Sequence, residues 1–236
     1  MSKTLIIIPA YNEEACILDT VKSIVDHNER SGTAYDYIVI NDGSTDSTEK
    51  LLSENGIPHI SLINNLGIGG AVQTGYKYAL INGYDIAIQF DGDGQHDISY
   101  AASLIGELEK GYDMAIGSRF VDNSDSEFRS SAARRAGIKI ISFFIKLLTG
   151  KKIYDPTSGF RAVNRSLISL FAEEYPTEYP EPVSEVAVLK RKFKVAETNA
   201  KMFERKGGRS SIRAWKSAYY MINVTLAMVT ESIKRY

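Results

Sequence analysis

Two aspartates, two positions apart in the stretch QFDGDGQHD at residues 89–97, are the clearest candidates for chemistry in this sequence. Asp91 and Asp93 follow an apolar run and stand among glycines, so both carboxylates are expected on one turn after a buried strand. Like charges this close repel each other and shift each other's pKa. A bound cation relieves that repulsion, and Mg²⁺ and Mn²⁺ prefer oxygen ligands. Because Mg²⁺ is usually held by one or two carboxylates plus substrate phosphates, the stretch predicts a metal site that serves a phosphate-bearing substrate.

The segments that must position this turn alternate between strand-like and helix-like patterns over the first half of the chain. Strands are expected at 4–10, 35–42, 59–64, 85–93 and 113–120. Helices are expected between them, at about 13–27, 44–54, 68–83 and 98–110. This order predicts an α/β fold with a mostly parallel sheet flanked by helices on both faces.

Polar residues stand just past the carboxyl end of four of the expected strands. The clusters are Asn12 with Glu13, Asn41 with Asp42, Asn64 with Asn65, and Asp91 with Asp93. Each could simply make a turn, since Asn, Asp and Gly are common turn residues. The whole set favours a ligand site, because open α/β sheets bind ligands beyond the carboxyl ends of their strands.

The second half contains two amphipathic helices of unusual character. Residues 134–152 predict a helix with a narrow polar stripe of Lys139, Ser142 and Lys146 and an otherwise apolar surface. Such a helix is either buried in the core or lies at a membrane interface, where flanking basic residues suit anionic headgroups. A final helix from about Ile212 carries a heptad-like seam, which is formed by Ile212, Trp215, Tyr219, Ile222, Leu226, Val229 and Ile233. The expected organisation is a catalytic domain at 1–211, which includes the 134–152 helix. A C-terminal amphipathic helix at 212–236 would then serve docking, dimerisation or a membrane partner.

Composition restricts the classes of function. Among 236 residues, 28 Lys and Arg balance 29 Asp and Glu, which argues against nucleic acid as the default partner. Cys16 is the only cysteine, so no disulfide framework exists and a reducing compartment is expected. No apolar stretch reaches the roughly 18 residues that a spanning helix needs. Any work at a membrane is therefore expected to be peripheral.

Several motifs together resemble the family 2 inverting glycosyltransferases of the GT-A fold. They are IIIPAYNEE, VINDGSTDST, NLGIGGAVQTG, FDGDGQH, GSRF and DPTSGFR, and the likeness continues through RKGGRSSIRAWKSAYYM. Within that family the sequence is most similar to dolichol-phosphate mannose synthases and bacterial polyprenyl-phosphate glycosyltransferases. One departure is Ile68, where many relatives carry a lysine. That change puts a cationic contact to the donor in doubt.

The resemblance implies a role for each matching residue. Asp91 and Asp93 would be catalytic, and with Gln95 they would bind Mg²⁺ or Mn²⁺ on the donor diphosphate. The nucleotide sugar, with a uridine donor as the commonest case, would contact Pro9, Ala10, Tyr11, Glu13, Asp42, Gly69, Asp91 and Gly92. The acceptor phosphate would contact Arg119, Arg134, Arg161, Arg209 and Ser210. His96 is read as structural, because a lone histidine beside a turn is more often structural than a metal ligand.

The implied reaction is sugar transfer from a nucleotide diphosphate sugar to polyprenyl phosphate at the cytoplasmic face of the cell membrane, for cell-surface polysaccharide or glycan assembly. A phosphate acceptor needs no general base. Transfer to a hydroxyl of a lipid-linked saccharide would need one, and Glu181 and Glu185 are the candidates. A non-catalytic nucleotide-sugar binding module is the third reading. A small separate membrane protein or a second copy of the chain would give the C-terminal seam a partner.

Overall fold

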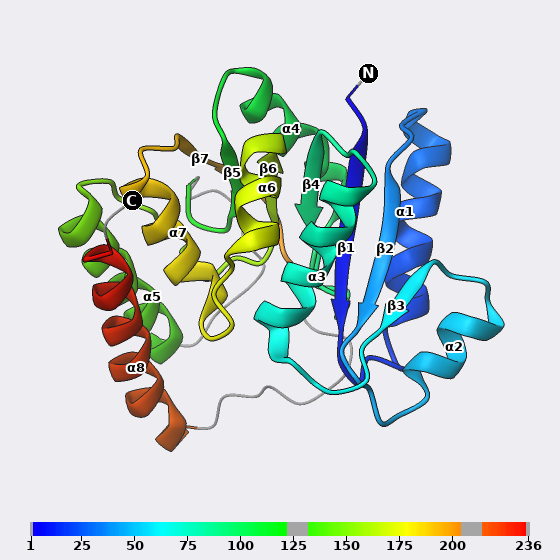
Figure 1. Cartoon of the computed structure of the whole chain (residues 1–236), viewed down its shortest axis with the longest axis horizontal. Helices are drawn as coiled ribbons and strands as arrows, with labels where there is room; N and C mark the ends of the chain where they lie inside the picture. Colours follow the sequence, from blue (N-terminus) through cyan, green and yellow to red (C-terminus); the bar gives the residue numbers. More distant parts are fainter. Residues whose placement is uncertain (1, 122–131, 204–213, 235–236) are drawn as a thin grey trace.

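One mixed sheet of seven strands forms the centre of the protein (Figure 1). The computed structural model describes residues 2–121, 132–203 and 214–234. The strand order is β3-β2-β1-β4-β6-β5-β7, and only β6 runs antiparallel to its neighbours in this part of the chain. The strands are β1 (Thr4–Ala10), β2 (Asp36–Asn41), β3 (His59–Ser61), β4 (Ile86–Gln89), β5 (Met114–Ser118), β6 (Arg161–Asn164) and β7 (Val195–Asn199). The predicted, mostly parallel α/β sheet is confirmed.

Alternating side chains of the buried strands face two separate cores. In β1, Leu5 and Ile7 point into one core, while Ile6 and Ile8 point into the other. The first core is covered by α3 (Gly67–Ile81), α5 (Ala132–Thr149), α6 (Arg165–Glu173), α7 (Pro180–Lys190) and α8 (Ala214–Ser232). The second is covered by α1 (Ile17–Ser31), α2 (Thr48–Glu54) and α4 (Ala101–Glu109), with the 3₁₀ turn η1 (Ile98–Tyr100). A continuous apolar strand is thus explained by burial on both faces.

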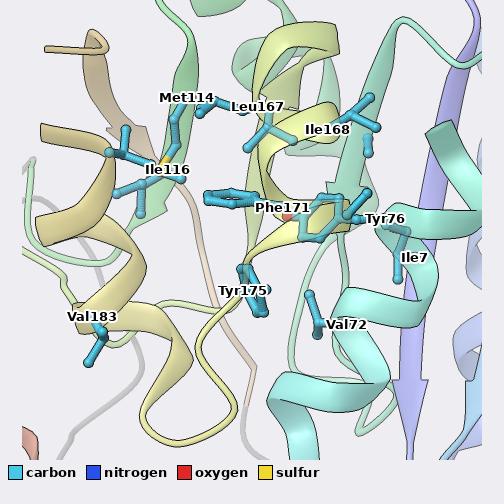
Figure 2. Packing of buried hydrophobic residues seen from close by; sticks show 14 of the residues in the cluster. Ile7, Val72, Tyr76, Met114, Ile116, Leu167, Ile168, Phe171, Tyr175 and Val183 are labelled. Atoms are coloured by element: carbon cyan, nitrogen blue, oxygen red, sulfur yellow. The ribbon is translucent and has the colours of Figure 1, made fainter. Parts of the chain in front are cut away.

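Three aromatic rings fill the centre of the first core (Figure 2). Phe171 of α6 packs against Tyr76 of α3 and against Tyr175, with ring centroids 5.1 and 5.0 Å apart. Figure 2 shows Met114 and Ile116 of β5 on the side of Phe171 that faces away from Tyr76. These contacts fix α3 and α6 against the sheet.

The region after β5 contains elements that the sequence patterns did not indicate. Strand β6 inserts antiparallel between β4 and β5, and β7 adds parallel to β5 at the edge. The helices α6 and α7 were also not predicted. Four-residue β6 is too short for a clear alternation, whereas α7 is nearly buried all round and therefore lacks an amphipathic period. Helix α1 begins four residues later than expected, because residues 13–16 form turns.

Helices α5 and α8 lie side by side and both contact α7 (Figure 1, left). Ile138, Ile141 and Ile145 of α5 are buried, as are Val224 and Met228 of α8. Both helices also carry apolar side chains that are exposed, namely Ile140, Phe143, Leu147, Tyr219, Ile222, Leu226 and Val229, and Ile233 directly after α8 is exposed as well. The predicted seam of α8, from Tyr219 on, is therefore the outward face of that helix. Among the described helices, none combines the length and the hydropathy needed to cross a membrane.

Candidate active site

The loops that follow β1 and β2 are tied together by the side chain of Asn12. Its Oδ1 accepts hydrogen bonds from the N–H groups of Thr45 at 2.7 Å and Asp46 at 3.3 Å, and its own N–H donates to Ser44 Oγ at 2.9 Å. Asn12 has a φ of 56°, a left-handed conformation that asparagine tolerates better than most residues. Four predicted donor contacts lie at this point of the chain. Pro9 and Ala10 end β1, and the exposed Tyr11 and the buried Glu13 follow in the loop.

Asp42 joins the ends of the first three strands. Its N–H donates to the carbonyl of Ala10 at 2.8 Å, and its Oδ1 accepts the N–H of Leu66 at 2.7 Å. The side chain of Asn65 donates to its carbonyl at 3.1 Å. Burial raises the pKa of Asp42, although backbone hydrogen bonds from Leu66 and Gly67 oppose that shift. The predicted convergence of polar clusters at one sheet edge is confirmed here.

The turn after β4 lies directly against the end of β1. A Cβ on Gly92 would stand 3.0 Å from the carbonyl oxygen of Pro9, and Thr20 Oγ1 of α1 donates to the Gly92 carbonyl at 3.0 Å. Gly69, another predicted donor contact, packs instead against the backbone of 176–177, where a Cβ would stand 2.2 Å from the Pro176 oxygen. Its visible role is close packing between α3 and the loop before α7.

Asp91 is held by three neighbours. Nε2 of His96 lies 3.1 Å from its Oδ2, and Nε2 of Gln89 lies 3.4 Å from its Oδ1. On the third side, a Cβ on Gly159 would stand 2.5 Å from the carboxylate, so only glycine fits there. Burial acts to raise the pKa of Asp91, but the hydrogen bond and charge of His96, with Gln89 and Arg161, hold it below its usual value.

Asp93 and Gln95 belong to a turn that is pinned to the segment after β7. The N–H of Gln95 donates to Asp93 Oδ1 at 3.0 Å. The Gln95 carbonyl accepts a hydrogen bond from the Phe203 N–H at 2.8 Å. The side-chain amide of Gln95 donates to the Phe203 carbonyl at 3.3 Å. An isolated antiparallel β-bridge pairs the neighbouring His96 with Met202. Residues 200–203 therefore run along the acidic turn. The predicted acceptor residues Arg209 and Ser210 lie outside the described residues.

Arg119, at the end of β5, makes a buried ion pair with Asp155. Its Nε donates to Oδ2 at 2.7 Å and its Nη2 to Oδ1 at 2.6 Å, while Nη2 also donates to Thr157 Oγ1 at 3.0 Å. Only 5% of Arg119 is exposed. This bidentate geometry fixes the guanidinium plane. A contact from Arg119 to an acceptor would have to be made without breaking that pair.

Arg134, in the first turn of α5, is the exposed member of the predicted acceptor set. Partial desolvation and the positive charge of Arg119 lower its pKa, while the charges of Asp155 and Asp93 act in the opposite direction. The pKa of Arg134 therefore responds to charges of the Arg119 pair and of the acidic turn. Its contact with an acceptor stays a prediction.

Arg161 lies inside the protein, in contrast to the expectation that it reaches an acceptor. It is 1% exposed and donates to the carbonyls of Ser158 and Glu181, to Ser184 Oγ, and to Glu185 Oε1 at 2.8 Å. Four of its five N–H donors are thereby used. Its position suits a residue that orders the 158–161 and 181–185 segments beneath Asp91.

The two glutamates proposed as alternative bases differ in their surroundings. Glu185 is fully buried and paired with Arg161, so it cannot contact an acceptor in this arrangement. Glu181 is half-buried, and its pKa is raised by burial, with the charge of Asp91 adding to that shift and Arg161 opposing it. Of the pair, only Glu181 is partly exposed.

The acidic turn fits a hard divalent cation in its donor chemistry. Asp91 and Asp93 are both half-buried at the sheet edge. An ionised carboxylate offers about four lone-pair sites, so the hydrogen bonds from Gln89 and His96 leave Asp91 able to bind a cation. In residues 2–121, 132–203 and 214–234, no three His, Cys, Asp or Glu side chains are grouped as a metal site. One or two carboxylates are the protein ligands with which Mg²⁺ is commonly held beside substrate phosphates.

The sequence patterns missed two residues that shape this site. The reading of His96 as structural agrees with its contacts, but its partner Asp91 was not foreseen; its buried ring packs against Phe90 and Phe160. Gln89 is fully buried at the end of β4, where a polar residue in an apolar strand was the available signal. A buried amide needs partners, and Asp91 is one of them.

Solved structures and relatives agree with this architecture. Glucosyl-3-phosphoglycerate synthase from Mycobacterium tuberculosis, crystallised with Mn²⁺, uridine diphosphate and phosphoglyceric acid, matches with a TM-score of 0.70 at 18% identity, over 100% of this chain and 80% of that one. This likeness confirms the GT-A fold. The UDP-N-acetylglucosamine–dolichyl-phosphate N-acetylglucosaminyltransferase of Methanococcus voltae is 34% identical over 212 residues, 80% of this chain and 80% of that protein.

A second relative extends over almost the whole chain. The undecaprenyl-phosphate 4-deoxy-4-formamido-L-arabinose transferase of Proteus mirabilis is 26% identical over 240 residues, 99% of this chain and 70% of that protein. Residues 5–171 match the protein family described as Glycosyl transferase family 2, and this match takes in the acidic turn, Arg119, Arg134 and Arg161. The chain therefore belongs to glycosyl transferase family 2 and is a glycosyltransferase.

Proposed function

We propose that this glycosyltransferase moves a sugar from a nucleotide diphosphate sugar to a polyprenyl phosphate, with inversion at the anomeric carbon. The observation that carries the proposal is an acidic pair, Asp91 and Asp93, on the turn after β4, together with the guanidinium of Arg119 at the end of β5, which Asp155 fixes in place. The acidic pair suits a metal-bound diphosphate, and the guanidinium suits a phosphate acceptor. The relatives from Methanococcus and Proteus are named for dolichyl and undecaprenyl phosphate acceptors, which supports this assignment.

The donor would lie across the ends of β1, β2 and β4. Tyr11 and Asp42 would hold the base, and the backbone at Gly92 would lie beside the ribose and diphosphate. Asp91 and Asp93, with Gln95, would hold Mg²⁺ or Mn²⁺. Bound there, the cation would offset the negative charge that builds on the leaving diphosphate. Asp91 can serve only if it stays ionised and oriented, and His96 and Gln89 favour both conditions.

The acceptor phosphate would approach from the start of α5. A phosphate monoester is already anionic near neutral pH, since its second pKa is about 6, so no side chain has to remove a proton. Arg134 would orient it, since guanidinium groups match phosphate oxygens in bidentate geometry. Arg119 would add positive charge while its pair with Asp155 keeps the guanidinium in place. Attack on the face opposite the diphosphate then inverts the sugar.

A hydroxyl of a lipid-linked saccharide remains the second candidate acceptor. Its support is Glu181, which is partly exposed and whose pKa is raised, chiefly by burial, as suits a general base. Glu181→Gln separates the two candidates, because transfer to a phosphate acceptor should survive that change. If Glu181→Gln loses all transfer and the unaltered protein does not accept polyprenyl phosphate, the hydroxyl acceptor is favoured.

We further propose that the enzyme works as a peripheral protein at the cytoplasmic face of a membrane. The exposed apolar side chains of α5 and α8 form two adjacent outward stripes, and Arg134 lies in the first turn of α5. An interfacial helix buries such a stripe at the boundary between headgroups and acyl chains. A lipid-borne phosphate would then meet the site at the membrane surface. The same stripes would also accept a small membrane protein or a second copy of this chain.

The decisive experiment incubates the protein and Mg²⁺ or Mn²⁺ with a panel of nucleotide sugars and polyprenyl phosphate, followed by mass spectrometry of the lipid fraction. Asp93→Asn should abolish the product and the metal dependence of donor binding in calorimetry. Asp85→Asn, an exposed aspartate at the amino end of β4, is the matched control. Arg134→Gln should retain donor binding and lose transfer, whereas Arg30→Gln on α1 should lose neither. Equal glycolipid formation by Asp93→Asn and the unaltered protein would refute the proposal.

A further inference from the structure

A groove of about 460 Å³ lies along α5 and is lined by nine residues. Four of them are cationic (Arg135, Lys139, Lys146 and Lys152), and three are aromatic (Phe120, Phe143 and Tyr154). The remaining two are Ile138 and Ser142, so none of the lining residues is acidic. A concave surface with this composition suits an anion that carries an apolar body.

The cations that α5 contributes stand on one helical face. Arg135, Lys139 and Lys146 are separated by four and seven residues, which places them in one line over 11 residues, or about 16 Å. A line of positive charge of this length attracts an anion that lies along it.

The wall opposite α5 is fixed to the helix by a buried contact. Ser142 Oγ donates to the carbonyl of Ile153, which ties the 151–154 segment to the middle of α5. Nζ of Lys152 lies 4.0 Å from the ring centre of Tyr154. The ammonium and the ring therefore stand together at the groove, a pairing that presents charge and apolar surface at one place.

We propose that this groove binds the phosphate headgroup of an anionic membrane lipid, separately from the acceptor that undergoes transfer. Phe143 lines the groove, and Ile140, Phe143 and Leu147 form an exposed apolar stripe on the same helix. Acyl chains would follow this stripe while the headgroup meets the lysines. Phe120 and Arg135 bring one end of the groove close to Arg119 and Arg134, whereas Lys146 lies about three turns of α5 beyond Arg134, so the headgroup is placed at the end formed by Lys146 and Lys152. The inference rests on the proposed work at a membrane surface.

The test measures binding to sedimented vesicles of phosphatidylcholine with and without phosphatidylglycerol. Unaltered protein should bind only the anionic vesicles. Lys146→Gln and Lys152→Gln should each weaken binding about fivefold, the effect of one basic residue at an anionic surface. Lys151→Gln is the matched control, because Lys151 is exposed beside Lys152 but donates to the Val195 carbonyl and does not line the groove. Its binding should stay within about twofold of the unaltered protein.

Three results would overturn the proposal. Equal losses in the Lys151 and Lys152 variants would mean diffuse attraction without a site. Equal binding to vesicles of pure phosphatidylcholine would mean an apolar contact only. If inorganic phosphate competes as effectively as a soluble short-chain phosphatidylglycerol, the groove is a site for free anions. Transfer to short-chain polyprenyl phosphate in detergent tests the proposed function by itself, so its failure is distinguishable from failure of the groove.

Discussion

His96 and Asp91 form a side-chain pair five residues apart, with Nε2 of the imidazole 3.1 Å from Oδ2 of the carboxylate. A carboxylate can only accept, so Nε2 carries the proton in this pair. The imidazole is 3% exposed and lies against the rings of Phe90 and Phe160, which fixes its direction. Asp91 is thereby aimed by a residue that contacts neither donor nor acceptor in the proposed arrangement.

Replacing His96 with phenylalanine should lower the affinity for the divalent metal, so that donor binding needs a higher Mn²⁺ concentration, while keeping the ring packing. Partners that orient a metal ligand commonly change metal affinity roughly 10- to 100-fold when they are removed. Calorimetric titration of nucleotide sugar at several Mn²⁺ concentrations measures this shift. His59→Phe is the control, since His59 bonds Glu49 and Ile57 at the edge strand β3. An unchanged metal dependence in His96→Phe would show that the pair has no such role.

Gly159→Ala should lower kcat/KM by about 100-fold without unfolding the protein. The added Cβ would stand 2.5 Å from the Asp91 carboxylate, so the aspartate has to move, and a shift of about 1 Å at a reacting centre costs on this order. Gly106→Ala in α4 is the matched control, because its Cβ meets no atom within 4 Å. That change should stabilise the protein by about 0.4–1 kcal/mol. Similar kinetics in both variants would contradict the steric argument.

Breaking the Arg161–Glu185 pair should be costly for stability. Both side chains are at most 1% exposed, and Glu185→Gln would leave a buried charge without its partner, which typically costs about 3–5 kcal/mol. The double variant Arg161→Met with Glu185→Leu should recover part of that loss. Urea denaturation measures each value. Glu174→Gln, which breaks an exposed pair with Arg191, should cost at most about 1 kcal/mol. Equal costs at the two pairs would disprove the buried-pair argument.

The first half of the fold could be predicted because its signals are local. Strand β1 is a continuous apolar run, and the clusters at Asn12, Asp42 and Asp91 mark strand ends by residue type alone. Strand β6 could not be placed this way. Its position between β4 and β5 depends on pairing with residues about 75 and 47 positions earlier, and no local period encodes that choice.

For the candidate site, the sequence names residue types along the chain but does not give their surroundings. Arg161 reads as a phosphate ligand in the motif TSGFR, but burial beside Glu185 decides what its guanidinium can contact. Sequence does not reveal burial for a charged residue when its partner lies 24 positions away. Phe203 likewise holds Gln95 across a separation of 108 residues. Such contacts follow from the completed fold.

Asp46 should make the stability of the β1–β2 loop pair pH-dependent. Burial acts to raise its pKa, but hydrogen bonds from the side chain and N–H of Thr48 and the N–H of Glu14 hold it below the usual 3.8. A lowered pKa in the folded protein means that the contribution is present above pH 3.8 and is lost as the pH falls through the folded pKa. Asp46→Ala should therefore cost about 1 kcal/mol near neutral pH, as the loss of an intramolecular hydrogen bond typically does. Urea denaturation at about pH 6 and about pH 3 should show that the stability difference between the unaltered protein and Asp46→Ala shrinks in acid. The Asp46→Asn side chain cannot titrate, so the stability difference between Asp46→Asn and Asp46→Ala should stay nearly constant. A wild-type advantage that persists unchanged at the lower pH would mean that the charge of Asp46 is not what stabilises the loop.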